Sequence, residues 1–339
     1  MLVGTGQSVV SFASNDYLGL AAHPSVVAAA HDALDRWGAG SGAARLVVGS
    51  RPIHTELEGA LAEWKGTERA VLYPTGFTAN LGVLSALAGP GVRVVSDELN
   101  HASIIDGCRL ARAEVRVYRH GDADHAAALV QGAPRAIVVS ETVFSMDGDE
   151  GPVAELGELC ASSGALLVLD DAHGVLARHD RSVPDGVEVV WVGTLSKTLG
   201  SLGGFAASSG RVADLLVNRS RPYIFTTAPA PASAAAALAG LAIIRSAEGD
   251  LRRCVLRGHV ERVRPGHPSP IIPIVVGAER AALDAAATLL AAGLLVPAIR
   301  PPTVPPGSSR LRVTLSAAHT AVQVERLLAA LAGTACRAT

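Results

Sequence analysis

The stretch Ala165-Leu-Leu-Val-Leu-Asp-Asp-Ala-His-Gly174 is an apolar run of strand length that ends in polar residues. A second run, Val187-Glu-Val-Val-Trp-Val-Gly-Thr-Leu-Ser-Lys197, ends in the same way. Such runs are typical of buried strands in a parallel sheet, whose ligands bind beyond the carboxyl ends of the strands. Because Asp170, His173 and Lys197 follow two such ends, we expect a carboxylate, an imidazole and an amine to lie at one site.

Lysine is rare in this chain, which contains only Lys65 and Lys197. We expect Lys65, in a polar helical stretch, to be a solvated surface charge. Lys197 lies among threonine, serine and glycine just past a buried strand, where a desolvated amine can lose its proton and form a Schiff base. A phosphate-binding lysine and a lysine at a helix start are the alternatives. Asp170 and His173 favour the Schiff base, because enzymes that use pyridoxal phosphate (PLP) need a lysine and an acidic partner for the pyridine nitrogen.

Composition excludes several classes of protein. The 339 residues suffice for one large α/β domain and a smaller one, and the net charge of −2 gives no basic field for nucleic acid. No apolar stretch reaches the roughly 20 residues of a membrane span, and the first residues show no secretory signal. The 11 histidines show no metal-ligand spacing. The four cysteines form no C-x-x-C pair, so we expect reduced thiols in a cytoplasmic protein; they are Cys108, Cys160, Cys254 and Cys336.

Strands alternate with helices over residues 70–208, which predicts a parallel sheet with helices on both faces. One turn, at 74–80, joins a strand to a helix start. It is a weak signal for an anion site, because free N–H groups and the helix dipole face such a ligand. The expected strands are 70–73, 92–96, 115–118, 136–140, 165–169 and 187–192; the expected helices are 24–37, 53–64, 152–163 and 211–218, with two more ending near residues 87 and 112.

The remaining segments predict a second, smaller unit. A long alanine-rich helix over 232–246 leads out of the large domain, and residues 250–268 give no clear prediction. We therefore expect a large PLP-binding α/β domain with a mostly parallel sheet over 24–228, and a smaller α+β domain formed by 1–23 with 229–339. The expected elements of the smaller domain are strands 9–13, 271–276, 294–299 and 311–315 and helices 279–291 and 320–332.

A series of motifs, in this order, resembles those of the α-oxoamine synthases, which are PLP enzymes of the aspartate-aminotransferase fold (fold type I). Each motif is modest alone, but together they run nearly the length of the chain. The last one favours the branch of the family that serves biotin synthesis. The motifs are Ser14–Leu20, Thr75–Phe77, His101–Ser103, Val143–Gly148, Asp170–Gly174, Thr194–Lys197 and Ile299–Arg312.

The resemblance implies roles around the cofactor. Lys197 would carry PLP covalently, Asp170 would keep the pyridine nitrogen protonated, and His173 would bond the ring hydroxyl. His101 would stack on the ring, although its position alone favours a helix cap. Ser145 would sit beside the ring. The phosphate would be held by Gly76, Phe77 and Thr194 and, from the neighbouring subunit, by Thr226 or Thr227.

The same resemblance implies substrates and a reaction. Asn15 and Arg300 would orient the amino-acid carboxylate, for which the planar fork of arginine is suited. Thr303 would line the substrate pocket, and His101 would also face the substrate. L-Alanine and pimeloyl-CoA would condense with loss of coenzyme A and carbon dioxide, after the Lys197 amine removes the Cα proton as general base. The product would be an aminoketone of biotin biosynthesis.

Shared active sites imply a homodimer that acts on small molecules, without a nucleic-acid or membrane partner. The chain departs from the family in a short stretch ahead of Asn15, in the segment 174–196, and near 250–270. These departures keep two alternatives open. One is a related synthase with another substrate pair, such as glycine and acetyl-CoA. The other is a catalytically silent PLP-binding paralogue.

Overall fold

The computed structural model describes residues 6, 8–176 and 183–333, which divide into two units. The larger unit spans Leu20–Phe144 and Glu150–Ser246; the smaller one takes the chain up to Gly19, Ser145–Asp149 and the chain from Ala247 on. The sequence places the boundaries after residues 23 and 228. In the structure helix α9 (Pro231–Ile244) lies in the larger unit, where it packs against α1 (Pro24–Trp37) and α2 (Pro52–Lys65). Cys336 and part of the segment 174–196, residues 177–182, lie outside the described residues.

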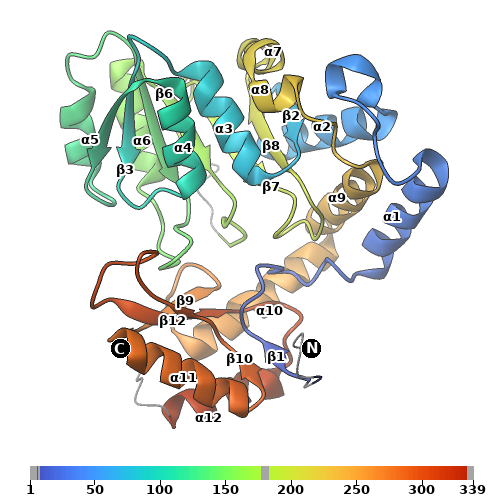
Figure 1. Ribbon diagram of the computed structural model, residues 1–339, viewed down its shortest axis with the longest axis vertical. Coiled ribbons are helices and arrows are strands. Elements are labelled where there is room, and N and C mark those ends of the chain that lie inside the picture. Colours follow the sequence, from blue (N-terminus) through green and yellow to red (C-terminus); the bar gives the residue numbers. More distant parts are fainter. Residues whose placement is uncertain (1–5, 7, 177–182, 334–339) are drawn as a thin grey trace. The chain divides into compact units, whose positions relative to one another are not determined.

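A seven-stranded sheet forms the centre of the larger unit, in the order β2-β8-β7-β6-β5-β3-β4 (Figure 1). All strands but β8 run in one direction, which confirms the mostly parallel sheet. β8 runs antiparallel to both neighbours because residues 195–203 are too few for the crossover that a parallel strand needs. The strands are β2 (Arg69–Tyr73), β3 (Arg93–Asp97), β4 (Glu114–Tyr118), β5 (Ala136–Glu141), β6 (Leu166–Asp170), β7 (Val189–Thr194) and β8 (Gly204–Ser208).

Helices cover both faces of this sheet. The core on one face joins inward strand residues such as Val139 and Val168 to Val83, Ile104 and Leu216 of three helices, α3, α4 and α7. Helices α2, α5 and α6 pack against the strands outside this core, on the other face (Figure 1). The sequence does not predict α5, which has only two turns. The helices not yet given are α3 (Gly76–Leu87), α4 (Ala102–Ala111), α5 (Ala123–Val130), α6 (Val153–Ser163), α7 (Gly210–Arg219) and α8 (Arg221–Ile224).

The smaller unit has the predicted α+β architecture. Its main sheet is antiparallel, in the order β11-β12-β9, and α11 packs on it. The strand expected over 294–299 is interrupted at Pro297, which has no N–H to donate. Most of the unassigned stretch 250–268 is helix α10, whose arginines pair with acids one turn earlier. The elements are β1 (Val10–Ser11), α10 (Ala247–Val263), β9 (Ile271–Gly277), α11 (Glu279–Ala291), β10 (Leu294–Leu295), β11 (Ala298–Ile299), β12 (Ser309–Thr314) and α12 (Ala321–Ala332).

A short π-helix, η1 (Arg45–Gly49), follows the small-residue loop after α1. Added Cβ atoms at Gly38, Gly40 or Gly42 of that loop would meet no other atom within 4 Å. Close packing therefore does not require glycine at these three positions. Across the described ranges, every helix is too short or too polar to span a bilayer.

Candidate active site

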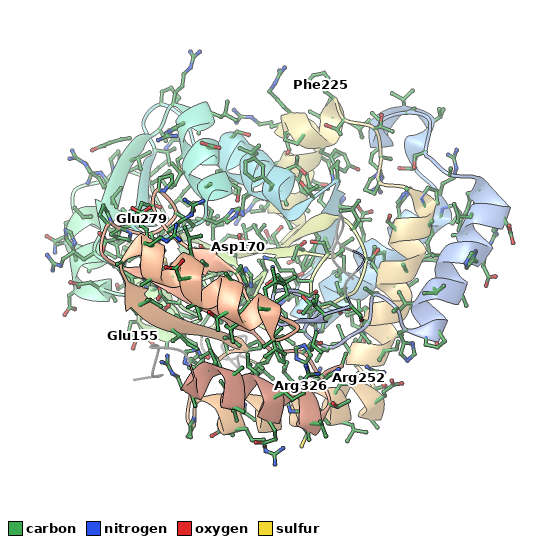
Figure 2. All side chains as sticks on the ribbon, turned by 60° about the horizontal axis from the view of Figure 1, so that its bottom comes forward. Glu155, Asp170, Phe225, Arg252, Glu279 and Arg326 are labelled. Carbon is green, nitrogen blue, oxygen red and sulfur yellow. The ribbon has the colours of Figure 1, made fainter. Side chains whose placement is uncertain are left out.

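Polar residues gather where the strands of the large sheet end. Asp170, the last residue of β6, pairs in register with Glu141 of β5 and with Val192 of β7. Thr194 of β7 pairs with Gly204 of β8. These carboxyl ends therefore share one edge of the sheet, where parallel sheets bind their ligands. Asp170 is buried there, and Figure 2 marks its position.

Lys197 and His173 are in direct contact at this edge. The Lys197 amine lies 2.7 Å from His173 Nε2, and the imidazole is buried. The two residues follow the neighbouring parallel strands β7 and β6, which is why they meet. A hydrogen bond of this length lets a proton pass between amine and imidazole. The structure thus brings the two predicted residues together, and their roles toward a cofactor stay predictions.

The Asp170 carboxylate is held by an amide on each side. Its Oδ2 accepts a hydrogen bond of 2.6 Å from Asn80 Nδ2, and its Oδ1 accepts one of 3.0 Å from the Ala172 amide. Asn80 also donates to Ser103 Oγ at 2.9 Å, which ties α3 to the start of α4. A turn and not a helix follows Asp170, so this carboxylate does not cap a helix. Nothing in the local sequence separates Asn80 from the other polar residues of α3, so this contact could not be predicted.

His101 caps helix α4, as its position in the sequence suggests. Its Nδ1 accepts a hydrogen bond of 3.2 Å from the Ser103 amide and lies 2.7 Å from Ser103 Oγ. Its ring stands edge-on to Phe77, with ring centroids 6.2 Å apart. The pKa of His101 is lowered, mainly by burial. The charge of Asp170 acts to raise this pKa, and the charge of Lys197 lowers it further. The cap holds an uncharged ring in place, and the predicted stacking on a cofactor stays a prediction.

Glu141 is a buried acid at the same edge that sequence analysis did not single out. Its Oε1 has no hydrogen-bond partner among the described residues. Burial raises the pKa of Glu141 well above its usual value; the nearby Asp170 raises it further, while Lys197 and the His101 amide lower it. Glu141, which pairs in register with Asp170, therefore keeps its proton to a higher pH than an ordinary glutamate does. The signal in the sequence was an acid as the last residue of an otherwise apolar strand.

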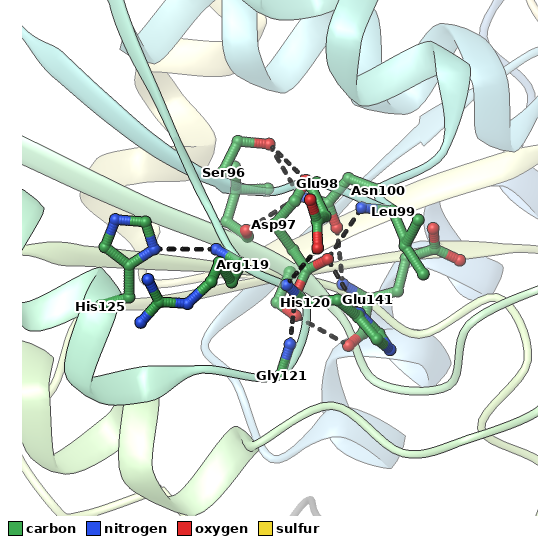
Figure 3. A network of polar contacts seen from close by, with 12 residues as sticks. Ser96, Asp97, Glu98, Leu99, Asn100, Arg119, His120, Gly121, His125 and Glu141 are labelled. Atoms are coloured by element: carbon green, nitrogen blue, oxygen red, sulfur yellow. Dashed lines mark hydrogen bonds and ion pairs between the residues drawn. The ribbon is translucent and has the colours of Figure 1, made fainter. Parts of the chain in front are cut away.

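A network of polar contacts fixes the loop that carries His101 (Figure 3). The side chain of Asn100 makes two hydrogen bonds to the backbone of β5. Its Nδ2 donates to Val139 O at 2.9 Å, and its Oδ1 accepts from the Glu141 amide at 3.1 Å. Buried Asp97 accepts from the Leu99 and Gly121 amides, each at 2.9 Å. The loop before α4 is therefore anchored to β3, β4 and β5 at once. Other members of this network are Ser96, Glu98, Arg119, His120 and His125.

Glu141→Gln is expected to raise the free energy of unfolding at neutral pH. The folded protein keeps Glu141 protonated above 4.5, the ordinary pKa of a glutamate, so the wild type loses stability as pH rises above that value. Glutamine has no proton to lose, so the gain should grow by about 1.4 kcal/mol per pH unit until the raised pKa is reached. Urea unfolding of the cofactor-free protein between pH 4.5 and 8 measures this difference in the free energy of unfolding. Glu155→Gln, at an exposed position, is the control. A difference between variant and wild type that is independent of pH would contradict the assignment.

The start of α3 forms a cradle suited to a phosphate. The amides of Gly76 and Phe77 take part in no hydrogen bond among the described residues, as first-turn amides of a helix lack intrahelical partners. A Cβ at Gly76 would lie 3.1 Å from Thr194 Cβ, so β7 closes one side of the cradle. The Thr194 hydroxyl lies 2.7 Å from Ser196 Oγ. Free amides, hydroxyls and a helix N-terminus together fit a cofactor phosphate.

Asn15, Arg300 and Thr303, three of the residues predicted to bind substrate, lie in the smaller unit, as does Ser145. His101, the fourth, lies in the larger unit. A buried arginine, Arg312, contacts both Asn15 and Ser145. Arg312 Nε donates to Ser145 O at 2.6 Å, and both terminal nitrogens lie 3.3 Å from Asn15 Oδ1. Burial lowers the pKa of Arg312, and Tyr17 opposes this shift. Arg300 and Thr303 are exposed, and among the described residues no hydrogen bond or ion pair joins them to Asn15. Arg312 ends the last of the sequence motifs, but the motif alone does not indicate a role for it.

Thr226 and Thr227 follow α8 on the surface of the larger unit. Both are exposed, and Thr227 forms an isolated bridge with Ala44 in the loop before η1. No hydrogen bond in the described part of the chain joins either one to Lys197 or Gly76.

The prediction that Lys65 is a solvated surface charge is wrong. Its amine forms an ion pair with Asp171, and each side chain is only 7% exposed. The amine also lies 4.4 Å from the ring centroid of Trp64 and 5.3 Å from that of Trp191. The burial comes from β6 and β7, far along the chain from α2, so the local sequence gives no sign of it.

A cavity of about 640 Å³ lies elsewhere, at the amino ends of the strands. It is lined by Ala136 and Leu166 at the starts of β5 and β6, and by Val130 and Arg135. It contains none of the predicted site residues, so we do not assign it to the active site.

Comparison with known proteins identifies the class. Residues 7–331 match the model of the aminotransferase class I and II family, so the chain belongs to this family, and the predicted fold class is confirmed. The serine palmitoyltransferase of Sphingomonas wittichii superposes with a TM-score of 0.91 at 33% identity, covering 97% of this chain and 89% of its own.

The particular relatives are 8-amino-7-oxononanoate synthases. The synthase of Burkholderia thailandensis is 49% identical over 96% of this chain and 89% of its own length. The structure of the Francisella tularensis synthase superposes with a TM-score of 0.80 at 25% identity, covering 96% of this chain and 97% of its own. The predicted kinship with this branch of PLP-dependent acyltransferases is confirmed.

Proposed function

We propose that the chain condenses L-alanine with pimeloyl-CoA, with loss of coenzyme A and carbon dioxide, to give 8-amino-7-oxononanoate for biotin biosynthesis. The observation that carries the proposal is the 49% identity to a synthase of that name over nearly the full length. The contact between Lys197 and His173, beside a buried Asp170, supplies the amine, base and acid that such a reaction needs.

The larger unit would bind the cofactor. PLP, when bound, supplies an electron sink for the charge left at the substrate Cα. The free amides of Gly76 and Phe77 would hold its phosphate, and the Asp170 carboxylate would face its pyridine nitrogen. Asn80 holds Asp170 by a 2.6 Å hydrogen bond and so limits the directions in which the carboxylate can point.

Lys197 would move the proton at the substrate Cα. Its amine lies 2.7 Å from His173 Nε2, so the imidazole can take a proton from the ammonium and return it. A neutral Lys197 amine can then accept the Cα proton and later give it back. The His173 ring is buried, so water has little access to the imidazole itself.

The smaller unit would bind the substrate carboxylate. Asn15 turns its Oδ1 toward Arg312 and the Tyr17 hydroxyl, at 3.3 and 3.2 Å, which leaves its amide nitrogen to donate to another acceptor. A carboxylate oxygen is such an acceptor. We therefore keep Asn15 and Arg300 as carboxylate ligands and Thr303 as a pocket residue, and add Arg312 as the group that orients Asn15.

Release of coenzyme A tests the substrates. The purified protein, saturated with PLP, is supplied with L-alanine and pimeloyl-CoA, and the free thiol and the aminoketone are measured. A matched reaction contains glycine and acetyl-CoA. We expect product from the first pair at a rate at least tenfold above the second. A preference for glycine and acetyl-CoA, or no turnover with either pair, would contradict the proposal.

We also propose that the chain works as a homodimer through one apolar surface. This η1 surface consists of Leu46, Val47 and Val48 with Phe225, which is labelled at the edge of the molecule in Figure 2. Val47, Val48 and Phe225 are 72%, 68% and 67% exposed. The two segments are adjacent, because the Ala228 amide donates to Ala43 O at 2.9 Å. Clustered exposed apolar residues of this size mark an interface, and a second copy of the chain would cover them.

The η1 surface also explains the position of the two threonines. Thr226 and Thr227 directly follow Phe225, so a partner seated on this surface would have them beside it. This supports the proposal that they reach the phosphate of the partner's cofactor.

Val47→Asp is expected to weaken the dimer at least 100-fold, because a charge would be buried without a partner in the interface. Light scattering over a dilution series measures the dissociation constant. Val322→Asp, at a site 69% exposed in the smaller unit, is the control and should leave the dimer intact. A wild type that is monomeric and fully active, or a Val47→Asp variant that dimerises normally, would contradict this interface.

A further inference from the structure

The cavity at the amino ends of the strands, which we call the amino-end cavity, is separate from the candidate active site. Its volume of about 640 Å³ is typical of small-molecule sites, which span roughly 300–1,000 Å³. Leu166 lies in its lining and begins β6, whereas Asp170 ends the same strand at the candidate active site. At about 3.3 Å per residue these two residues are about 13 Å apart along the strand. A ligand of this cavity would therefore bind at a second site.

One positive charge lines the amino-end cavity. Among the described residues of the lining, Arg135 is the only one that carries a charge. It is exposed, and within residues 6, 8–176 and 183–333 its guanidinium forms neither an ion pair nor a hydrogen bond. The same is true of the carboxamide of Gln131, which also lines the cavity. These N–H groups suit an anion, and the planar fork of arginine matches a carboxylate in particular.

The loop that carries Gln131 and Arg135 is held in place by Arg93. Arg93 Nη1 donates to Leu129 O and to Gln131 O, each at 3.0 Å, and the Arg93 amide donates to Arg135 O at 2.9 Å. These bonds also satisfy carbonyls at the end of α5, whose dipole would otherwise disfavour an anion. Arg93 is itself paired with Glu114 at 3.2 Å. The loop is thus positioned before a ligand arrives, which reduces the loss of entropy on binding.

The other walls of the amino-end cavity offer no free donor and are largely apolar. The hydroxyls of Ser162 and Ser163 both donate to Leu159 O, at 3.0 and 2.7 Å. Leu87 and Leu159 are only half-buried, so part of each side chain is open to a ligand. Each methylene group that such walls cover strengthens binding by roughly fourfold at most. A ligand with one negative charge and an aliphatic chain therefore fits both parts of the lining.

We propose that the amino-end cavity binds a carboxylate at the end of a short aliphatic chain. The carboxylate would lie on Arg135, and the chain would run along the apolar walls. This inference does not depend on the proposed reaction, because it uses none of the residues assigned to it. Either proposal can therefore fail without the other.

Calorimetric titration of the PLP-saturated protein with octanoate tests the proposal. We expect octanoate to bind at least tenfold more tightly than acetate, which lacks the chain, and than octylammonium, which has the opposite charge. Arg135→Gln should weaken octanoate at least tenfold. Arg109→Gln, at an arginine of α4 whose side chain is 76% exposed, is the matched control and should bind octanoate as the wild type does. Ala127→Phe keeps Arg135 but fills the cavity, and it should also weaken octanoate at least tenfold.

Three results would overturn the proposal. One is octanoate binding that Arg300→Gln removes and Arg135→Gln keeps, since the carboxylate would then occupy the candidate active site. The second is binding of octylammonium or inorganic phosphate as tight as that of octanoate. The third comes from octanoate with a diazirine on its chain, which also serves if Ala127→Phe does not fold. Photolysis and mass spectrometry should find its label within residues 127–137 or 159–166, and a label elsewhere would contradict the site.

Discussion

Lys197→Ala is expected to abolish the covalent link between protein and cofactor and to lower turnover on the order of 10⁴-fold or more, the upper end for loss of a positioned general base. The amine is both the point of attachment and the base that lies 2.7 Å from His173. Borohydride treatment followed by mass spectrometry measures the link, because reduction fixes the cofactor to its lysine in the wild type and should fix none in the variant.

Lys65→Arg is the matched control for this experiment. It alters the only other lysine while keeping the charge that pairs with Asp171. We expect full fixation of cofactor in Lys65→Arg. If Lys197→Ala kept the link while Lys65→Arg lost it, the assignment of the attachment site would be wrong.

Asp170→Asn is expected to slow loss of the Cα proton from L-alanine by on the order of 10²–10⁴-fold, the range for one positioned catalytic interaction. Asparagine keeps the shape and can still bind Asn80, but it lacks the charge that favours a protonated pyridine nitrogen. Covalent attachment at Lys197 should persist, because it involves the aldehyde carbon alone. Deuterium exchange with PLP saturating separates these two effects.

Asp171→Asn is the control for the same experiment, since it removes the adjacent carboxylate on the other side of the sheet. Near-normal exchange in Asp170→Asn would mean that another acid faces the ring nitrogen. Glu141, which pairs in register with Asp170, would then be the group to replace next.

The fold could be predicted from sequence wherever the pattern is local. The strand runs that end at Asp170 and Thr194, and the capped helices on either side of them, are encoded in apolar periodicity, turns and caps. The direction of β8 was harder to predict from sequence, because it is set by the short connection 195–203 and not by the residues of the strand itself. Helix α10 was missed because its arginines and acids hide the apolar stripe of Leu256, Val260 and Val263.

The candidate site divides in the same way. Asp170, His173 and Lys197 could be predicted because each lies at or just after the end of an apolar run that is recognisable as a strand. Asn80, Glu141 and Arg312 acquire their contacts from distant segments, and nothing near them in the sequence shows it. Lys65 was misread for this reason, since Trp191 and Asp171 bury a residue whose own neighbours look like a helix surface.

The scarcity of lysine, together with the burial of Lys65, makes this protein selective toward amine-directed labels. Apart from the terminal amine, a reagent such as a succinimidyl ester would find one accessible target, the half-buried Lys197, and bound cofactor would protect it. Within residues 1–339, a protease that cleaves after lysine would cut only after residues 65 and 197. A label on Lys197 would prevent cleavage after this residue, and bound cofactor would prevent labelling. The extent of cleavage after Lys197 in one digest would therefore measure the fraction of a preparation that carries its cofactor.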